Sequence, residues 1–340
     1  MSVPPRLSPA ERSVAGTGDG ADGANGADHH LVASLLTRCC FPGPGTPLVC
    51  GVSGGADSLA LLVLAVASGC EVTAVHVDHG LRPGSAGEAE VVAAAAHRFG
   101  AGFRSVRVEV DDGPNLEARA RTARLAALGP GAATGHTMDD QAETVLANLL
   151  RGSGVHGLSG MRAGPVHPLL GLRRAETVAV CRQLGLEPLV DPSNHDPRHL
   201  RNRIRHELLP LCSALAGRDV VPVLARQAGA LAGDADLLDA VAGLVDPEDA
   251  AALAAAPEPV ARRTVRAWLT GDGAYPPSLD AVDRVLAVAR GERRAVEVAG
   301  GRRVGRSRGR LSVAPSPTPV AELPGSGPVD TPVQSHRGHR

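Results

Sequence analysis

Between residues 47 and 151, short apolar runs alternate with longer segments in which apolar residues recur at helical spacing. The short runs are typical of buried strands and cover residues 47–52, 70–79, 103–110 and 131–135. The helix-like segments cover residues 56–68, 85–99, 115–128 and 138–151. Because strand and helix units alternate along the chain, we predict an α/β fold with a parallel, doubly wound sheet and right-handed crossovers.

The pattern changes on both sides of this region. Residues 1–28 are mostly Gly, Ala, Asp, Ser and Pro without periodicity, and we expect them to be disordered. We place a catalytic domain at 29–213 and a smaller, mainly α-helical domain at 214–313, where three amphipathic segments occur. Residues 314–340 are rich in Pro, Ser, Gly and Thr and are predicted to form a disordered tail.

Composition narrows the class of protein. The chain has 340 residues, 43% apolar and 21% charged, which is typical of a globular protein with a substantial core. No apolar run is long enough to cross a membrane, and the N-terminus lacks a signal-peptide core. Six cysteines form no C-x-x-C pair, so we expect a reduced, cytoplasmic setting. The sequence leaves the oligomeric state open, with a homodimer as one expectation.

Charge is balanced overall but concentrated locally. The net charge is −1, so any nucleic-acid surface must be a local patch. All 35 basic residues are arginine, and seven of them lie between Arg293 and Arg310. This segment is a predicted RNA-phosphate contact, in particular through Arg302, Arg303 and Arg306. The alternative is a solvated, arginine-rich β-ribbon.

The segment Ser53-Gly54-Gly55-Ala56-Asp57-Ser58 follows the first predicted strand and opens a helix. The first amides of a helix have no internal partner and its dipole favours negative charge, so this junction predicts a phosphate site. Asp57 would repel a phosphate unless a cation lay between them, and we therefore predict ATP with Mg²⁺. The alternative is a tight turn in which Asp57 caps the helix.

Further polar residues lie at the ends of the other predicted strands. Asp78 and His79 follow the second strand, and His136 to Asp140 follow the fourth. Ligands of open α/β sheets bind beyond these carboxyl ends. We therefore expect His136 and Asp140 to lie opposite Asp57 in a metal site for a polyphosphate. Carboxylates at a helix N-terminus also complement the dipole, which is the alternative for Asp139.

Two arginine clusters complete the set. Arg121 and Arg124 share one face of a predicted helix and could clamp a phosphate or a carboxylate, although a solvated basic face is the simpler interpretation. Residues 198–205 contain four arginines with Asn202 between them. We interpret Arg201, Asn202 and Arg205 as contacts to tRNA phosphates or as part of a closure over the nucleotide.

Several motifs occur in a fixed order between Leu48 and Leu211: SGGADS, HVDHGLR, NLEARARTAR, GHTMDDQAETVLANLLRGSGVHGLSGM, HPLLGLRRAET, DPSNHD and RNRIRHELLP. As a set they resemble the bacterial tRNA(Ile)-lysidine synthetases, which belong to the N-type ATP pyrophosphatase (PP-loop) superfamily. Two positions depart from that family: Leu125 stands where Tyr is common, and Asp78 where Asn is common.

The resemblance implies a specific reaction. ATP adenylates the C2 oxygen of cytidine 34 in the CAU anticodon of tRNA(Ile), and free L-lysine then displaces AMP to form lysidine. It implies that Asp57 and Asp140 hold Mg²⁺ and that Arg121 stabilises the transfer. ATP would contact Ser53, Gly54, Gly55, Ala56, Asp57, Ser58, His79 and His136. Lysine and cytidine would contact Glu117, Arg124, Asp139 and Glu143.

Two other functions remain as alternatives. A PP-loop tRNA thiolase would use the same ATP loop, but it would want catalytic cysteines, and Cys181 and Cys212 stand alone in the sequence. A non-catalytic ATP-binding sensor would need neither the acids at 139, 140 and 143 nor an arginine-rich second domain.

Overall fold

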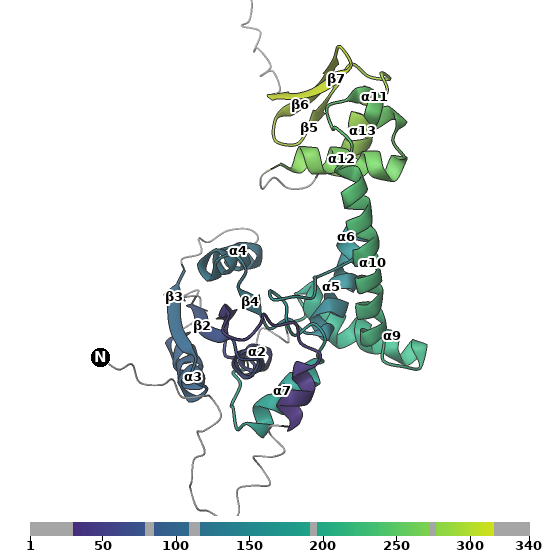
Figure 1. Cartoon of the computed structure of the whole chain (residues 1–340). Helices are drawn as coiled ribbons and strands as arrows, with labels where there is room; N and C mark the ends of the chain where they lie inside the picture. The colour runs from purple at the N-terminus through teal and green to yellow at the C-terminus, as the bar shows by residue number, and fades with distance from the viewer. Residues whose placement is uncertain (1–29, 79–84, 109–115, 191–195, 272–276, 316–340) are drawn as a thin grey trace, which may run out of the picture. The chain divides into compact units, whose positions relative to one another are not determined.

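The computed structural model describes residues 30–78, 85–108, 116–190, 196–271 and 277–315 (Figure 1). They form two compact units that divide between Ala235 and Asp236, and each unit is described by itself. The N-terminal segment, the tail and His79 lie outside the described residues.

The first unit is built on a four-stranded parallel sheet with the strand order β3-β2-β1-β4. Its strands are β1 (Pro47–Gly51), β2 (Glu71–Asp78), β3 (Gly102–Arg107) and β4 (Ala133–Thr134). The predicted parallel α/β sheet is therefore confirmed. β4 is only two residues long and pairs Ala133 and Thr134 with Cys50 and Gly51.

Helices pack on both faces of this sheet, as a doubly wound fold requires. α2 (Ala56–Ala67) and α3 (Ser85–Arg98) cover one face and α4 (Leu116–Leu128) covers the other. α5 (Met138–Leu150) follows β4 and packs with the helices described next. Because side chains alternate along a strand, Leu48 and Cys50 pack in the core formed with α2, whereas Val49 packs with Leu128 of α4 on the other face. This arrangement places the N-terminus of α2 at the carboxyl end of the central strand β1.

The rest of the first unit packs helices around α5. The elements are α6 (Val155–Leu158), α7 (Arg174–Gln183), α8 (Leu200–Arg203), the π-helix η2 (Ile204–Leu208), α9 (Leu209–Ala216) and α10 (Val221–Ala242), which runs past the division. Ile204 and Leu209 pack against Ala142 and Leu146 of α5. This small core holds the arginine-rich segment at 201–205 beside α5.

In its described part, the second unit combines the end of α10 and three further helices with a three-stranded antiparallel sheet of order β5-β6-β7. Its elements are α11 (Ala250–Ala255), α12 (Glu258–Thr270), α13 (Leu279–Ala289), β5 (Ala295–Val298), β6 (Arg302–Ser307) and β7 (Arg310–Pro315). Val304 and Leu311 pack with Val285 of α13 in its core. The arginine-rich segment therefore forms a β-ribbon, as the alternative interpretation of this segment expected. That interpretation had the ribbon solvated, whereas one face of it is buried.

Among the described residues, no single helix is both long and apolar enough to cross a membrane. One pair of helices is long and apolar enough for a membrane span only if its two parts are taken together. These parts are Leu200–Ala216 and Val221–Ala242, and they lie at 96° to each other.

Candidate active site

The loop between β1 and α2 has the geometry expected of a phosphate site. Gly54 has a positive φ of 85°, and a Cβ there would lie 2.6 Å from Leu189 Cδ1, so the position needs glycine. The Ser53 amide donates to Ser58 Oγ at 3.1 Å, and that hydroxyl donates to the Gly55 carbonyl at 2.9 Å. These bonds fix the loop and leave the N-terminal turn of α2 facing the end of the sheet.

A close backbone contact brings the end of β4 to this loop. A Cβ on Gly135 would lie 2.7 Å from the backbone oxygen of Asp57, so only glycine allows this approach. Since α5 begins three residues later at Met138, the contact carries the acids of its first turn to the loop. Thr137 caps α5: its amide and its hydroxyl both donate to Asp140 Oδ2, at 2.8 and 2.9 Å.

Three carboxylates meet around one guanidinium. Arg174 donates to Asp57 Oδ2 at 3.2 Å, to Asp140 Oδ1 at 2.9 Å and to Glu143 Oε1 at 3.1 Å. Burial raises the pKa of Asp57 in spite of Thr177 and Arg174, which both favour its charged form. Burial acts the same way on Asp140, but Arg174 and Arg201 outweigh it and hold the pKa of Asp140 below its ordinary value.

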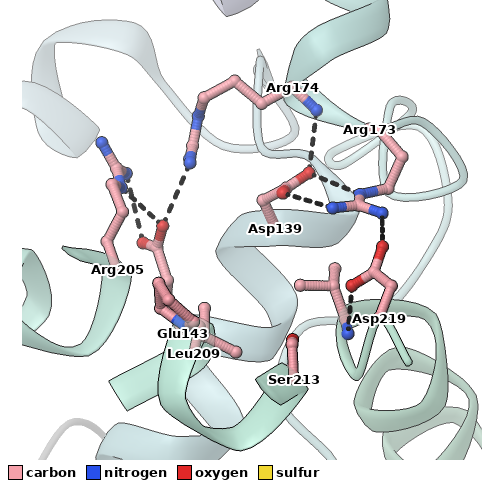
Figure 2. Close-up of a pocket in the computed structure, with 10 residues that line it drawn as sticks. Asp139, Glu143, Arg173, Arg174, Arg205, Leu209, Ser213 and Asp219 are labelled. Carbon is pink, nitrogen blue, oxygen red and sulfur yellow. Dashed lines mark hydrogen bonds and ion pairs between the residues drawn. The ribbon is translucent and has the colours of Figure 1, made fainter. Parts of the chain in front are cut away.

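Glu143 is the anchor of this cluster. Its side chain is fully buried, and besides Arg174 it accepts from Arg201 Nε and Arg205 Nε, both at 2.7 Å (Figure 2 shows the pairs with Arg174 and Arg205). Asn202 donates to the Asp196 carbonyl at 2.9 Å. The guanidiniums of Arg201 and Arg205, which we predicted as tRNA contacts, are thus directed at the acids of α5.

A cavity of about 200 Å³ lies beside the cluster and is lined by Asp139, Glu143, Arg205 and Asp219 among others (Figure 2). Asp139 is held by Arg173 Nε and Nη2, both at 3.1 Å, and by the Arg174 amide at 2.8 Å. Arg173 also pairs with Asp219. Burial disfavours the charged form of Asp139, but Arg173 and the Arg174 amide outweigh it and keep its pKa low.

Two histidines share a hydroxyl at the end of β4. Thr134 Oγ1 lies 2.8 Å from His136 Nδ1 and 2.9 Å from His167 Nδ1, and the two rings are edge to face. Burial lowers the pKa of His136 to about 4, with Asp140 opposing the shift, and it also lowers the pKa of His167. His136 is therefore neutral at pH 7. Its partner His167 was not among the predicted site residues.

We expect this histidine to make stability depend on pH. Between pH 6.5 and 4 the unfolded chain binds a proton at His136 that the folded chain does not, so stability falls as the pH is lowered through this range. Denaturant unfolding measures the effect. Between pH 7 and pH 4 the free energy of unfolding of the wild type should fall by about 3 kcal/mol more than that of His136→Asn. Equal slopes for the two proteins would contradict the buried, neutral state.

The remaining predicted residues of the first unit lie on α4. Arg121 is exposed, and its charge contributes to the lowered pKa of His136, so it lies near the cluster. Burial lowers the pKa of Arg124, and the charges of Arg121 and Arg201 add to the effect. Glu117 lies in the first turn of α4, but its side chain is outside the described part of the structure.

The predicted arginines of β6 do not share one face. Arg302 and Arg306 lie on the same face of β6 as buried Val304. Their guanidiniums donate to the carbonyls of Ala299 and Ala289, respectively, at the edge of the core. Arg303 lies on the opposite, exposed face, across from Glu297 of β5. A tRNA contact on this ribbon would therefore approach Arg303 from the outer face and the other two from the edge.

The acids fit a magnesium ion that is shared with a nucleotide. Within the described residues, no three His, Cys, Asp or Glu side chains are grouped as a protein-only metal site. Asp57 and Asp140 nevertheless approach one guanidinium from two elements, so their oxygens face the same small volume. Mg²⁺ commonly takes one or two carboxylates and completes its shell with phosphates and water.

Three residues of this site were not among the predicted ones. Arg173, Arg174 and Thr177 lie in the motif HPLLGLRRAET, and no role was predicted for any of them. Thr177 Oγ1 donates to Asp57. Two adjacent arginines at the start of a helix oppose its dipole, and this was the available signal that they serve nearby acids.

The parallel sheet, the glycine loop and the acids at the strand ends define a PP-loop ATP-binding domain. In agreement, the PP-loop domain family matches residues 31–212, and the TilS substrate binding domain family matches residues 249–312. The chain is 44% identical over 312 residues to the tRNA(Ile)-lysidine synthase of Nocardia farcinica, covering 84% of this chain and 96% of that one. It therefore belongs to the tRNA(Ile)-lysidine synthase family.

Two further comparisons found similar proteins. The tRNA(Ile)-lysidine synthase of Mycolicibacterium paratuberculosis is 48% identical over 239 residues, covering 66% of this chain and 74% of that one. Among solved structures, the U34-tRNA thiolase NcsA of Methanococcus maripaludis matches with a TM-score of 0.46 and 16% identity, over 62% of this chain and 80% of that one.

Proposed function

We propose that this protein is an ATP-dependent ligase that joins L-lysine to C2 of cytidine 34 in the CAU anticodon of tRNA(Ile), releasing AMP and pyrophosphate. The observation that supports it most is the convergence of Asp57 and Asp140 beside the glycine loop in a chain of this family. Both free lysine and tRNA(Ile) are substrates in this proposal, and ATP supplies the activation. We place the reaction in the cytoplasm, in keeping with six free cysteines.

In this reaction the loop and the acids would act on the phosphates. The amides at the start of α2 would bind the departing pyrophosphate, and Asp57 and Asp140 would hold Mg²⁺. When bound, the metal neutralises charge on the phosphates during transfer. Arg121 and Arg124 of α4 would face the α-phosphate and the cytidine. Neutral His136 can exchange hydrogen bonds with the nucleotide without adding charge.

The cavity beside the cluster is our proposed lysine site. A volume of about 200 Å³ suits one amino acid, and its acidic lining of Asp139, Glu143 and Asp219 offers oxygens for amines. Arg205 on the same wall could take the carboxylate of the substrate. Because each of these acids is paired with an arginine, lysine would have to compete for it.

The cysteines disfavour the thiolase alternative. All six are unpaired. Cys181 contacts the loop, where its thiol donates to the Ala56 carbonyl at 3.4 Å. Burial raises the pKa of that thiol to about 11, and the charge of Asp57 adds to the effect, so it is protonated at pH 7 and a poor nucleophile.

Mass spectrometry of nucleosides tests the proposal. Transcripts of tRNA(Ile) with a CAU anticodon would be incubated with the full chain, ATP, Mg²⁺ and L-lysine, and then digested. We expect cytidine 34 to gain the mass of lysine less one water, only when ATP and lysine are both present. Unmodified cytidine, or sulfur incorporation from a sulfur donor, would refute the assignment.

Replacing Arg302, Arg303 and Arg306 together with alanine should weaken tRNA binding. Each lost phosphate contact would also reduce the slope of log K against log salt by about 1. Binding titrations between 50 and 200 mM salt measure both effects. Arg262→Ala and Arg284→Ala are matched controls. They remove arginines of α12 and α13 that pair with Asp283 and Asp280, and they should leave the slope unchanged. An unchanged slope in the triple variant would indicate a solvated ribbon.

A further inference from the structure

Arg174 is the common partner of the acids that we assign to the metal. Three of its nitrogens, Nε, Nη2 and Nη1, donate to Asp57, Asp140 and Glu143 respectively. Its side chain is 24% exposed, whereas Glu143 is fully buried. A single guanidinium therefore pairs with carboxylates that come from two separate elements, α2 and α5.

Helix formation does not explain an arginine at this position. Arg174 is the first residue of α7, where the dipole disfavours a positive charge, and Arg173 precedes it as the N-cap. Without a cation, Asp57, Asp140 and Glu143 would repel one another in a poorly solvated volume. The position of Arg174 is thus explained by the acids and not by its own helix.

The guanidinium and a metal ion need the same oxygens. Asp140 Oδ2 is occupied by the amide and hydroxyl of Thr137, which leaves Oδ1 for a metal, and Oδ1 accepts from Arg174 and from Arg201. Likewise, Asp57 Oδ1 accepts from Thr177 and Oδ2 accepts from Arg174. A metal that binds both carboxylates must therefore compete with Arg174 or Arg201 at Asp140 and with Thr177 or Arg174 at Asp57. Arg174 is the donor common to both acids.

We propose that Arg174 is a resident counter-ion: it holds Asp57 and Asp140 in place before nucleotide-bound Mg²⁺ arrives and yields Asp140 to the metal. The displaced guanidinium then faces the phosphates, where its charge remains useful. This inference rests on the proposed use of ATP and Mg²⁺, and it adds a positioning role for a residue outside the predicted site. If Arg174 formed only a structural ion pair, replacing it would not change the affinity of the protein for Mg²⁺.

Magnesium alone, without nucleotide, separates the two cases. In Arg174→Gln the acids keep their charges and lose the one cation that all three share, while Arg201 and Arg205 stay on Asp140 and Glu143. Mg²⁺ should therefore bind at least about tenfold more tightly than in the wild type. At concentrations near ten times the new Kd, thermal unfolding of the first unit should rise by about 3–5 °C in the variant and little in the wild type. Adding Asp57→Asn to Arg174→Gln should abolish the gain.

Arg173→Gln is the matched control, because it removes the neighbouring charge but contacts Asp139 and Asp219 instead of the metal pair. It should respond to Mg²⁺ as the wild type does. If Arg174→Gln does not fold, Arg174→Lys, which cannot reach three carboxylates at once, should show an intermediate response. If Mg²⁺ raised the unfolding temperature of the Arg174 variant no more than that of the wild type, the proposal would be overturned. Since neither tRNA nor lysine is used, this outcome is independent of lysidine formation.

Discussion

Replacing Asp57 with asparagine is expected to lower ATP-dependent lysidine formation by about 1000-fold or more, while tRNA still binds. The carboxylate would be one of two protein ligands to Mg²⁺, and an amide offers it no negative charge. Pyrophosphate release in the presence of tRNA and lysine measures the loss, and a gel-shift or filter-binding titration measures tRNA affinity.

The same change should leave the fold intact. Burial raises the pKa of Asp57, which means that the folded state disfavours its charge, so a neutral side chain of the same shape is tolerated. Arg174 keeps Asp140 and Glu143 as partners. The control is Asp283→Asn, which removes a carboxylate paired with Arg262 in the second unit and should retain activity. Normal turnover in Asp57→Asn would remove this residue from the metal site.

Replacing Glu143 with glutamine should produce the largest loss of stability in the first unit, about 3–5 kcal/mol in the free energy of unfolding. The buried carboxylate is the shared partner of Arg174, Arg201 and Arg205, and the amide would leave the three guanidiniums with Asp140 as their common partner. Denaturant unfolding followed by circular dichroism measures the change.

Glu207→Gln provides the matched comparison for Glu143. It removes an exposed carboxylate of η2 that pairs with Arg203 four residues away, and it should cost less than about 1 kcal/mol. A loss in Glu143→Gln no larger than in Glu207→Gln would show that the arginines find other partners, and that Glu143 does not anchor the cluster.

Much of the first unit was predictable because its signals are local. Strand–helix alternation gave the order of elements, and the glycines of the loop gave a phosphate site next to Asp57. Even the two-residue strand β4 was located, because it lies within the short run at residues 131–135 between two helix-like segments. The co-location of Asp57 and Asp140 followed from parallel-sheet topology, in which the carboxyl ends of all strands lie at one edge.

The partners of the acids were not predictable in the same way. Arg174 lies 34 residues from Asp140 and 117 from Asp57, and only the packing of α7 against α2 brings it to them. Arg201 and Arg205 read as a basic surface in the sequence, yet the core around Ile204 directs them toward Glu143. In the second unit, arginines are so frequent that the alternation of buried and exposed residues in β6 was not apparent from the sequence. Val304 is buried there between Arg303 and Gly305.

The most direct test is a crystal structure of the full chain with Mg²⁺ and a non-hydrolysable ATP analogue. We predict that the terminal phosphates contact the amides of residues 54–58 and that Mg²⁺ lies about 2.1 Å from an oxygen of Asp57 and from Oδ1 of Asp140. A nucleotide bound away from this loop, or a metal that touches neither carboxylate, would contradict the account.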